Sequence, residues 1–360
     1  MASPESPSQD AVSIVSSIFT VRGIQQNLDT FQFEIDEEGF KEKFVTLIQR
    51  LEPLNLAARL ERLDGRLFIL VARFQPPRPS RIWIPRVLFA VTVAFVMIDG
   101  YFRTVYANTI IPIGDPLQIA VLYTASLIGI LGIHELGHII ALRKHKIRAT
   151  WPYFIPGIPV FGIPTFGALI MQRGFMKNRD ILFDVGFAGP IAGLIVALVV
   201  TAYGAYVSPV VPVNEAQALF SKSDFIQVHP SILMSGIITL TGRTTEGMEM
   251  LMSPVLYAAW LGFLITFLNL LPAWQLDGGH IARAALGRKW HKITTYIGIV
   301  ILFGLGYWFM ALLIFSFSMS RFDVRPLDDI SPLSKRRKLV FVIAMALAVV
   351  TAPHPFSSMH

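Results

Sequence analysis

The sequence predicts a polytopic α-helical membrane protein with about six transmembrane helices, a re-entrant β-like segment and a small N-terminal soluble α+β domain. Three observations predict this fold class. The 360 residues are 53% hydrophobic and only 15% charged, with a mean hydropathy of +0.56, whereas soluble domains carry about 25% charged residues. Long apolar runs dominate from Ile82 onward, and residues 1–79 lack them.

The composition also limits the chemistry. There is no cysteine, which excludes disulfides, thiolate metal sites and cysteine nucleophiles. The formal net charge of +7 is expected to follow membrane topology, so we expect the lipid bilayer and no nucleic acid as a partner. The first residues, MASPESPSQD, are polar and acidic, so a cleavable secretory signal is not expected.

Residues 1–79 predict a cytoplasmic α+β domain. The stretch EEGFKEKFVTLIQRL has helical patterning, and two β-like runs, LAARLER and RLFILVARF, flank Asp64-Gly65. An Asp-Gly pair between such runs is a strong hairpin signal. The domain is expected to end in the linker QPPRPSR.

Six apolar segments are predicted to span the membrane, each near the length of about 20 residues that crosses the hydrocarbon core. Residues 80–292 hold the first four, residues 293–360 the last two, and the last is short enough for a partial insertion. The spans are Ile82–Tyr101, Leu117–Leu142, Val185–Tyr206, Val255–Leu271, Ile293–Met319 and Leu339–Pro353.

Loop charges predict an orientation. Basic residues dominate the loop between the second and third spans and the loop after the fourth, whereas Val207–Pro254 is acidic on balance. The positive-inside rule therefore places the two basic loops and the N-terminal domain in the cytoplasm. The basic run Lys335–Lys338 disagrees with simple alternation, so either the rule fails there or one of the last two spans is misread.

The stretch WPYFIPGIPVFGIPTFGALIMQRG, Trp151–Gly174, fits neither a span nor a solvated loop. Its four prolines prevent a helix, yet it is apolar. Non-helical backbone is tolerated at membrane depth only where protein or a watered cavity covers it. We expect a re-entrant segment, with a β-hairpin as one form that it can take.

The stretch GIHELGHII places three ionisable side chains inside the second span. His134 and His138 share one face of a helix, where they can hold one metal ion, and Glu135 is placed to reach a metal-bound water. This is the H-E-x-x-H pattern of zinc metalloproteases, in which the glutamate takes a proton from that water. The alternative is a histidine pair satisfied by neighbouring helices, although ionisable groups within a span are usually functional.

A catalytic zinc site needs a third protein ligand, and the sequence offers two. His145 lies seven residues beyond His138, past the end of the span. Asp277 lies in NLLPAWQLDGGH, Asn269–His280, where a proline and a glycine pair break the helix and let the carboxylate turn inward. Asp277 can instead cap the next helix, but an HExxH motif within a span favours the ligand role.

The two motifs together resemble the site-2 protease family of intramembrane zinc metalloproteases, in its six-span branch without a PDZ insertion. The resemblance covers roughly Ile82 to Lys292 and rests on HELGH, FAGPIAG and NLLPAWQLDGGH. The family often has a second proline where this chain has Trp274, which changes the expected loop shape. The resemblance implies one zinc ion bound by three ligands, a general base and a residue that positions the substrate or the oxyanion. The three ligands are His134, His138 and Asp277. The general base is Glu135, and the residue that positions the substrate or the oxyanion is Asn269.

The resemblance also implies a substrate, a single-span membrane protein cut by regulated intramembrane proteolysis. A transmembrane helix must unwind locally before cleavage, and a strand edge can capture the unwound segment. The predicted substrate-binding residues are Thr165, Phe166 and Gly167 in PTFGAL. The alternative is that the glycines and prolines only shape a cytoplasmic loop.

Other residues receive supporting roles. Gly186, Gly189 and Gly193 in the third span are expected to allow close helix packing. Asp184 is expected to cap that helix or bind a loop, and His280 to support the site.

Two other functions remain open. A membrane metalloprotease of the prenyl-protein type also carries HExxH, but its third ligand is usually a downstream glutamate, and the first acids after His138 are Asp180 and Asp184. A metal transporter or an inactive relative is the non-enzymatic alternative. An intact Glu135 argues against the inactive relative, and a transporter would show ionisable residues in several spans or a repeat.

Overall fold

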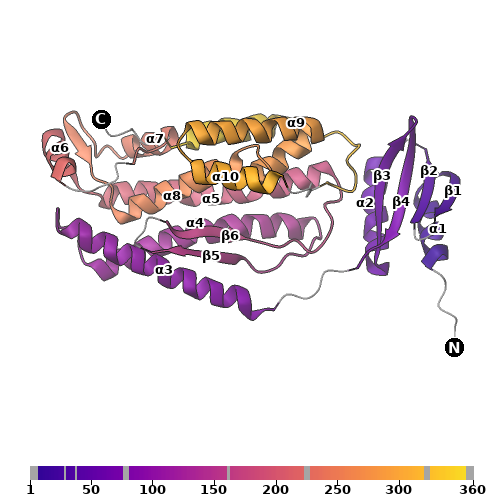
Figure 1. The fold of residues 1–360 in the computed structure, drawn as a ribbon, viewed down its shortest axis with the longest axis horizontal. Coiled ribbons are helices and arrows are strands. Elements are labelled where there is room, and N and C mark those ends of the chain that lie inside the picture. The colour runs from indigo at the N-terminus through magenta and orange to yellow at the C-terminus, as the bar shows by residue number, and fades with distance from the viewer. Residues whose placement is uncertain are drawn as a thin grey trace.

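The computed structural model describes residues 7–27, 30–36, 39–75, 81–159, 163–222, 228–319 and 325–353. An N-terminal α+β domain lies at one end of an elongated body of helices (Figure 1). Most of the predicted linker QPPRPSR, residues 76–80, falls outside the described residues.

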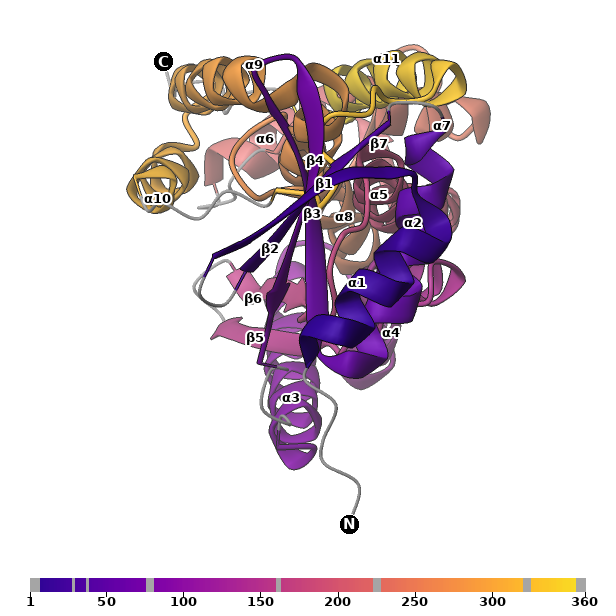
Figure 2. The ribbon, with the colours of Figure 1, turned by 90° about the vertical axis from the view of Figure 1, so that its right-hand side faces the viewer.

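The N-terminal domain is an antiparallel sheet of order β1-β2-β4-β3 with α1 and α2 on one side of it (Figure 2). Its elements are α1 (Pro7–Ile18), β1 (Val21–Asn27), β2 (Thr30–Ile35), α2 (Phe40–Leu51), the 3-10 turn η1 (Glu52–Leu54), β3 (Leu56–Leu63) and β4 (Arg66–Arg73).

Alternation along the strands builds the core of this domain. Successive residues of a strand point to opposite faces, so Leu60 of β3 and Ile69 of β4 are buried with the apolar residues of α2. The predicted hairpin is confirmed, because Asp64 (φ 49°) and Gly65 (φ 79°) form the turn between β3 and β4. Two positive φ values in a two-residue turn are typical of type I′.

Three of the described helices are long and apolar enough to cross a membrane. They are α3 (Trp83–Asn108), α4 (Pro116–Lys144) and α5 (Arg179–Val207). The helices α8 (Pro254–Leu270) and α10 (Trp308–Ser318) are apolar but shorter. The other elements of the body are β7 (Val210–Pro212), α6 (Val213–Lys222), α7 (Ile232–Leu240), β8 (Met248–Met250), α9 (Asp277–Gly304) and α11 (Lys335–Thr351).

The centre of the body is the contact of α4, α5 and α8. Leu127 of α4, Leu194 of α5 and Phe263 of α8 are buried together in one apolar cluster. The first part of α9 packs against α5. The polar residues of the HExxH motif therefore lie within an apolar framework built by four helices.

The predicted fifth span, Ile293–Met319, is not one helix. A break at residues 305–307 separates α9 from α10, which packs back along α9 (Figure 1). Gly306 has φ 83°, and the Tyr307 N–H donates to the Leu302 carbonyl at 2.9 Å. This is the Schellman arrangement that ends helices at a glycine. Glycines within the apolar run therefore turn the chain where hydropathy predicted one continuous span.

The proline-rich stretch Trp151–Gly174 contains a β-hairpin. β5 (Tyr153–Ile158) pairs antiparallel with β6 (Ile163–Leu169), and residues 160–162 of the connection fall outside the described residues. Both strands pack against α3, and β6 also packs against α4. The hairpin thus flanks the helix that carries the HExxH motif (Figure 1).

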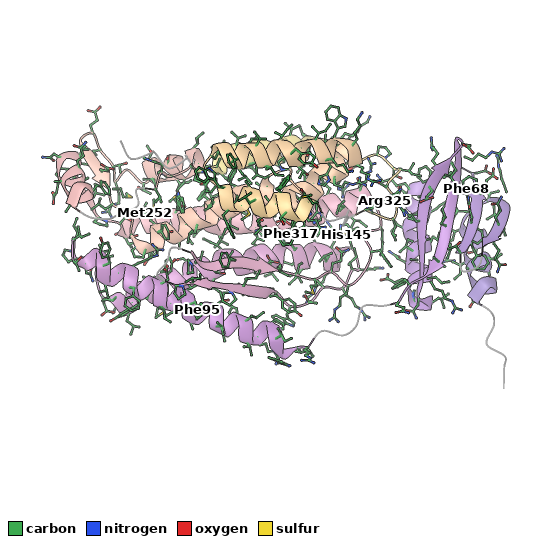
Figure 3. All side chains as sticks on the ribbon, in the orientation of Figure 1. Phe68, Phe95, His145, Met252, Phe317 and Arg325 are labelled. Atoms are coloured by element: carbon green, nitrogen blue, oxygen red, sulfur yellow. The ribbon has the colours of Figure 1, made fainter. Side chains whose placement is uncertain are left out.

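The basic run Lys335–Lys338 lies at the same end of the body as the C-terminus of α4. Arg337 pairs with Asp184 of α5 at 2.6 Å, and Asp184 also contacts His145 at 3.0 Å. Figure 3 shows His145 at the end of the body next to the N-terminal domain. α10 packs back along α9, so the predicted fifth span is a pair of helices, and the chain enters α11 at the same end of the body as the C-terminus of α4. The conflict with simple alternation therefore disappears.

Candidate metal centre

Three side chains from two distant segments converge inside the body. His134 and His138 of α4 both direct Nε2 at the carboxylate of Asp277, the first residue of α9. Oδ2 of Asp277 is 3.2 Å from Nε2 of His134 and 3.3 Å from Nε2 of His138, and the two nitrogens are 3.1 Å apart. Within the described part of the chain, these residues form the group arranged to hold a metal ion. Both histidines are buried.

The size of this triangle fits a zinc ion. A near-equilateral triangle with these sides has its centre roughly 1.9 Å from each corner, which is close to the usual zinc–ligand distance of 2.0–2.2 Å. Two imidazoles and one carboxylate leave a fourth tetrahedral position open, which distinguishes catalytic from structural zinc sites. The donor set therefore suits a catalytic zinc ion.

A hydrogen bond fixes the tautomer of His138. Its Nδ1 lies 2.8 Å from the carbonyl oxygen of Val185, and a carbonyl only accepts, so Nδ1 carries the proton. In the neutral ring, Nε2 then presents a lone pair to Asp277. A lone pair and a carboxylate repel each other at this distance, and a cation between them turns the repulsion into coordination.

Glycines of α5 make room for both histidines. A β-carbon on Gly189 would fall on the imidazole of His138, and one on Gly193 would lie 3.1 Å from Cβ of His134. The sequence interpretation of Gly186 and these two glycines as packing residues is confirmed. The structure adds that two of them pack against the metal-ligand side chains themselves.

The connection between α8 and α9 delivers Asp277 to the histidines. Residues 271–276 are not helical, and α9 begins at Asp277 itself. Gly278 and Gly279 lie so close to backbone carbonyl groups of this connection and of the end of α8 that a β-carbon on either would clash. The glycine pair therefore permits the tight turn that the sequence predicted.

Trp274 takes the position where the family resemblance led us to expect a second proline. Its φ is 44°, its N–H donates to Oγ1 of Thr295 at 2.9 Å, and its carbonyl lies 2.9 Å from Nε2 of His291. Its ring stacks on Phe317 of α10 with centroids 5.2 Å apart. Contacts from α9 and α10 thus fix the shape of the connection.

Glu135 is buried next to the ligands, with an exposed fraction of 5%. Across the described residues, no hydrogen bond or ion pair ties down its carboxylate. A buried carboxylate beside an ion, without a fixed partner, is suited to accept a proton from a metal-bound water.

Asn269 lies near the end of α8 and faces the same centre. Its Nδ2 is 3.4 Å from Nε2 of His134. Because Nδ2 is a donor, the amide is placed to hydrogen-bond an oxygen that approaches the open coordination position.

His145, the second candidate for the third ligand, points elsewhere. Its Nε2 contacts Oδ2 of Asp184 at 3.0 Å, and Asp184 also accepts two hydrogen bonds from Arg337. Asp184 therefore joins the end of α4, α5 and the start of α11, whereas the cap of α5 that the sequence analysis allowed for it is supplied by Asn178. These hydrogen bonds raise the pKa of Arg337, which stays charged. His280 belongs to the first turn of α9, after Asp277, and its side chain lies beside Gly186 of α5.

Thr165, Phe166 and Gly167 lie at a bulge in β6. Phe166 and Gly167 together oppose one residue of β5, Ile155, and Gly167 has φ 94°. Oγ1 of Thr165 donates to the Ile155 carbonyl at 2.9 Å, whereas the Phe166 ring is 52% exposed. Bulges redirect side chains and are common beside active sites. Substrate binding by these residues stays a prediction.

Comparison with known proteins gives one family. The model described as Peptidase family M50 matches residues 122–305, a range that contains the three ligands. No solved structure matches the chain.

Several curated relatives from plants are similar to the chain. "Probable zinc metalloprotease EGY2, chloroplastic" of Arabidopsis thaliana is 31% identical over 240 residues, which cover 63% of this chain and 41% of the relative. "Probable zinc metalloprotease EGY1, chloroplastic" of the same plant is 32% identical over 241 residues, with coverage of 62% and 41%. The chain thus spans about two fifths of the length of these relatives.

Proposed function

The chain belongs to peptidase family M50, and on this premise we propose that it is a zinc-dependent metalloendopeptidase that cuts membrane-anchored proteins within or near their transmembrane helix. The observation that carries the proposal is the meeting of His134, His138 and Asp277 at one point inside an apolar helical body. The relatives named as zinc metalloproteases support zinc as the ion.

The residues of the site divide the chemistry among them. A zinc ion held by the three ligands would supply a bound water of lowered pKa and a positive charge beside the scissile carbonyl. Glu135 accepts the proton of the attacking water and passes it to the leaving nitrogen. The Asn269 amide donates a hydrogen bond to the carbonyl oxygen as negative charge develops there.

The metal ligands are largely shielded from bulk solvent by the surrounding helices. The ligand histidines are 4% and 6% exposed, and burial strengthens the electrostatic interactions among the ligands and the ion. His138 is only a few residues from the basic C-terminus of α4, so in this proposal water reaches the site from the end that faces the N-terminal domain.

The proposal includes a topology. α3, α4 and α5 span the bilayer, and α8, the α9–α10 hairpin and α11 complete the multi-pass body around the site. The positive-inside rule places the basic C-terminus of α4, the basic start of α11 and the N-terminal domain in the cytoplasm. Their placement at one end of the body (Figure 1) supports a single cytoplasmic face.

The substrate in this proposal is a single-span membrane protein. The β5–β6 hairpin beside α4 is proposed as a re-entrant element at membrane depth, since protein covers non-helical backbone there. A locally unwound substrate helix would add to the edge of β6 beside Phe166. Regulated intramembrane proteolysis is the process that the resemblance to site-2 proteases implies.

The other two functions are less well supported. The ligand set contains an aspartate from a distant helix instead of the downstream glutamate of prenyl-protein-type enzymes. A transporter does not require a buried carboxylate poised beside the ion, as Glu135 is.

A cleavage assay tests the proposal. The full chain, in lipid nanodiscs, is incubated with a panel of single-span substrates, with and without a zinc chelator. Glu135→Gln is expected to retain zinc and to cut at least ~100-fold more slowly, the contribution of a general base. Retained cleavage in Glu135→Gln or in fully chelated protein would rule the proposal out.

A further inference from the structure

The carboxylate of Asp329 is surrounded by guanidinium groups. Arg283 of α9 binds it with two parallel hydrogen bonds, of 3.0 Å to Oδ1 and 2.7 Å to Oδ2. Arg179, the first residue of α5, donates Nε to Oδ1 at 3.0 Å. Nε of Arg325, whose side chain is more exposed than that of Asp329, lies 3.5 Å from Oδ2.

Arg283 is an unusual residue for its location, since it is 1% exposed. Burying a guanidinium is costly unless it is paired, and apolar residues of similar size stabilise a core at least as well. A bidentate arginine–carboxylate pair has a fixed geometry, so it specifies the relative position of the two segments that it joins. Apolar packing does this poorly. The pair therefore defines where this part of α9 lies.

This part of α9 carries a metal ligand. Asp277 and Arg283 lie on the same short helical segment, about 9 Å apart along its axis at 1.5 Å per residue. The segment starts after the non-helical residues 271–276 and ends at Gly287, whose backbone (φ 79°, ψ 179°) leaves the helical region. The continuity of a long helix, which places His134 and His138 on α4, does not place Asp277.

The partner of Arg283 is itself held on two sides. Asp329 belongs to residues 325–334, here called the tie segment, which lead into α11. The N–H groups of Leu327 and Asp328 donate to the carbonyls of Met176 and Lys177 just before α5, at 2.9 and 3.0 Å. The tie segment is thus fixed to the helical body.

The N-terminal domain holds the other side of the tie segment. The Leu60 N–H of β3 donates to the Leu327 carbonyl at 3.1 Å, and Lys41 of α2 reaches the Pro332 carbonyl at 3.1 Å. The side chains of Leu327 and Ile330 pack on the core of the domain. The tie segment therefore connects the N-terminal domain to the segment that carries Asp277.

We propose that Arg283 and Asp329 are positioning residues of the metal centre, through which the tie segment holds the Asp277 carboxylate in register with His134 and His138. The inference rests on the proposed metal site and adds residues that touch neither the ion nor the substrate. Loss of the pair leaves all three ligands present but lets the Asp277 segment shift.

Metal binding by the full chain in detergent tests this inference. Zinc affinity is measured by competition with a chromophoric chelator, and the cobalt(II)-loaded protein reports coordination geometry through its visible d–d absorption. Asp329→Asn is expected to weaken zinc binding about 10- to 100-fold, the usual effect of residues that orient ligands, and to change the cobalt spectrum. Arg325→Gln is the matched control, because it removes a guanidinium from the same carboxylate without touching α9, and it should bind zinc as wild type does.

A double variant separates positioning from folding. Arg283→Met with Asp329→Leu replaces the bidentate pair by an apolar contact, and Arg179 keeps its hydrogen bond to the backbone carbonyl of residue 329. This variant is expected to restore a monodisperse, folded protein if Asp329→Asn fails to fold. A purely structural pair predicts that the double variant also recovers wild-type zinc affinity and cobalt spectrum, and that recovery would overturn the inference. Persistently weak binding with an altered spectrum supports it.

The same experiment distinguishes this inference from the proposed function. If wild type binds no more zinc or cobalt than His134→Ala, the metal site and the positioning role fall together. If wild type binds and Asp329→Asn binds equally with the same spectrum, the positioning role alone is wrong.

Discussion

The imidazole of His138 occupies the space that a side chain on Gly189 would take. The glycine lies on α5 and the histidine on α4, so the packing of these two helices leaves room for a metal ligand. Gly189→Ala is therefore expected to displace the ring from Asp277 and to weaken zinc binding at least ~10-fold. Competition with a chromophoric chelator measures the change.

Gly132→Ala serves as the control for Gly189→Ala. Gly132 lies on α4 two residues before His134, and a β-carbon there meets nothing within 4 Å. Alanine is the better helix former, so this variant should fold well and bind zinc like wild type. Equal affinities in the two variants would contradict the steric role of Gly189.

Removal of the ion is expected to destabilise the protein. The three ligand atoms are 3.1–3.3 Å apart in the folded protein, and the unfolded chain does not bring them together, so the free energy of ion binding stabilises the fold. With free zinc at 100 times the dissociation constant, binding adds about 2.7 kcal/mol to the free energy of unfolding. Thermal unfolding followed by the fluorescence of the six tryptophans should shift to lower temperature with chelator. The His138→Ala variant should show no such shift, and a shift of equal size there would point to another effect of the chelator.

His145 is predicted to be dispensable for metal binding. Its imidazole contacts Asp184 and lies outside the ligand group. His145→Ala should keep zinc affinity within about 2-fold of wild type and lose about 1 kcal/mol of stability, as expected for a partly buried pair. A loss of zinc binding as large as that of His138→Ala would restore His145 as a ligand.

The sequence predicted those parts of the fold that depend on local patterns. Asp64-Gly65 specifies its own turn, and the apolar length of α3, α4 and α5 follows directly from composition. The division of Ile293–Met319 into α9 and α10 was missed, because hydropathy averages over the glycines that end α9. The spacing of Gly304 and Gly306 was the available signal.

Those site residues were predictable that have a regular spacing in the sequence or are the only carboxylate in a long stretch. His134 and His138 follow from helical periodicity, and Asp277 from being an isolated carboxylate after a helix break. The two roles of Gly189 and Asp329 were not predictable, because each depends on a partner far away in the sequence. A motif of small residues has the same sequence whether it packs against the backbone of a helix or against an imidazole, so the sequence does not distinguish the two.

The buried carboxylate of Asp99, which lies away from the metal centre, is predicted to stabilise the body without affecting zinc binding. Its Oδ2 accepts hydrogen bonds from Nε of Arg103 at 2.6 Å and from the Tyr123 hydroxyl at 2.8 Å, and its exposed fraction is 1%. Arg103 also lies 4.2 Å from the centre of the Tyr257 ring. The cluster thus joins α3 to α4 and α8.

Asp99→Asn removes the charge that pairs with the partly buried Arg103, so we expect a loss of roughly 3–5 kcal/mol in the free energy of unfolding. Denaturation in detergent measures this loss. Tyr123 and His134 lie about 16 Å apart along α4, so zinc affinity should stay within 2-fold of wild type.

The control for Asp99→Asn is Asp115→Asn, the same chemical change at the exposed N-cap of α4. Oδ1 of Asp115 accepts from the Gln118 N–H at 2.8 Å, and asparagine caps a helix about as well as aspartate. Its stability should therefore be close to that of wild type. Equal losses in the two variants would mean that the Asp99 cluster contributes no more than an ordinary surface contact, and that α3 is held to the body by apolar packing alone.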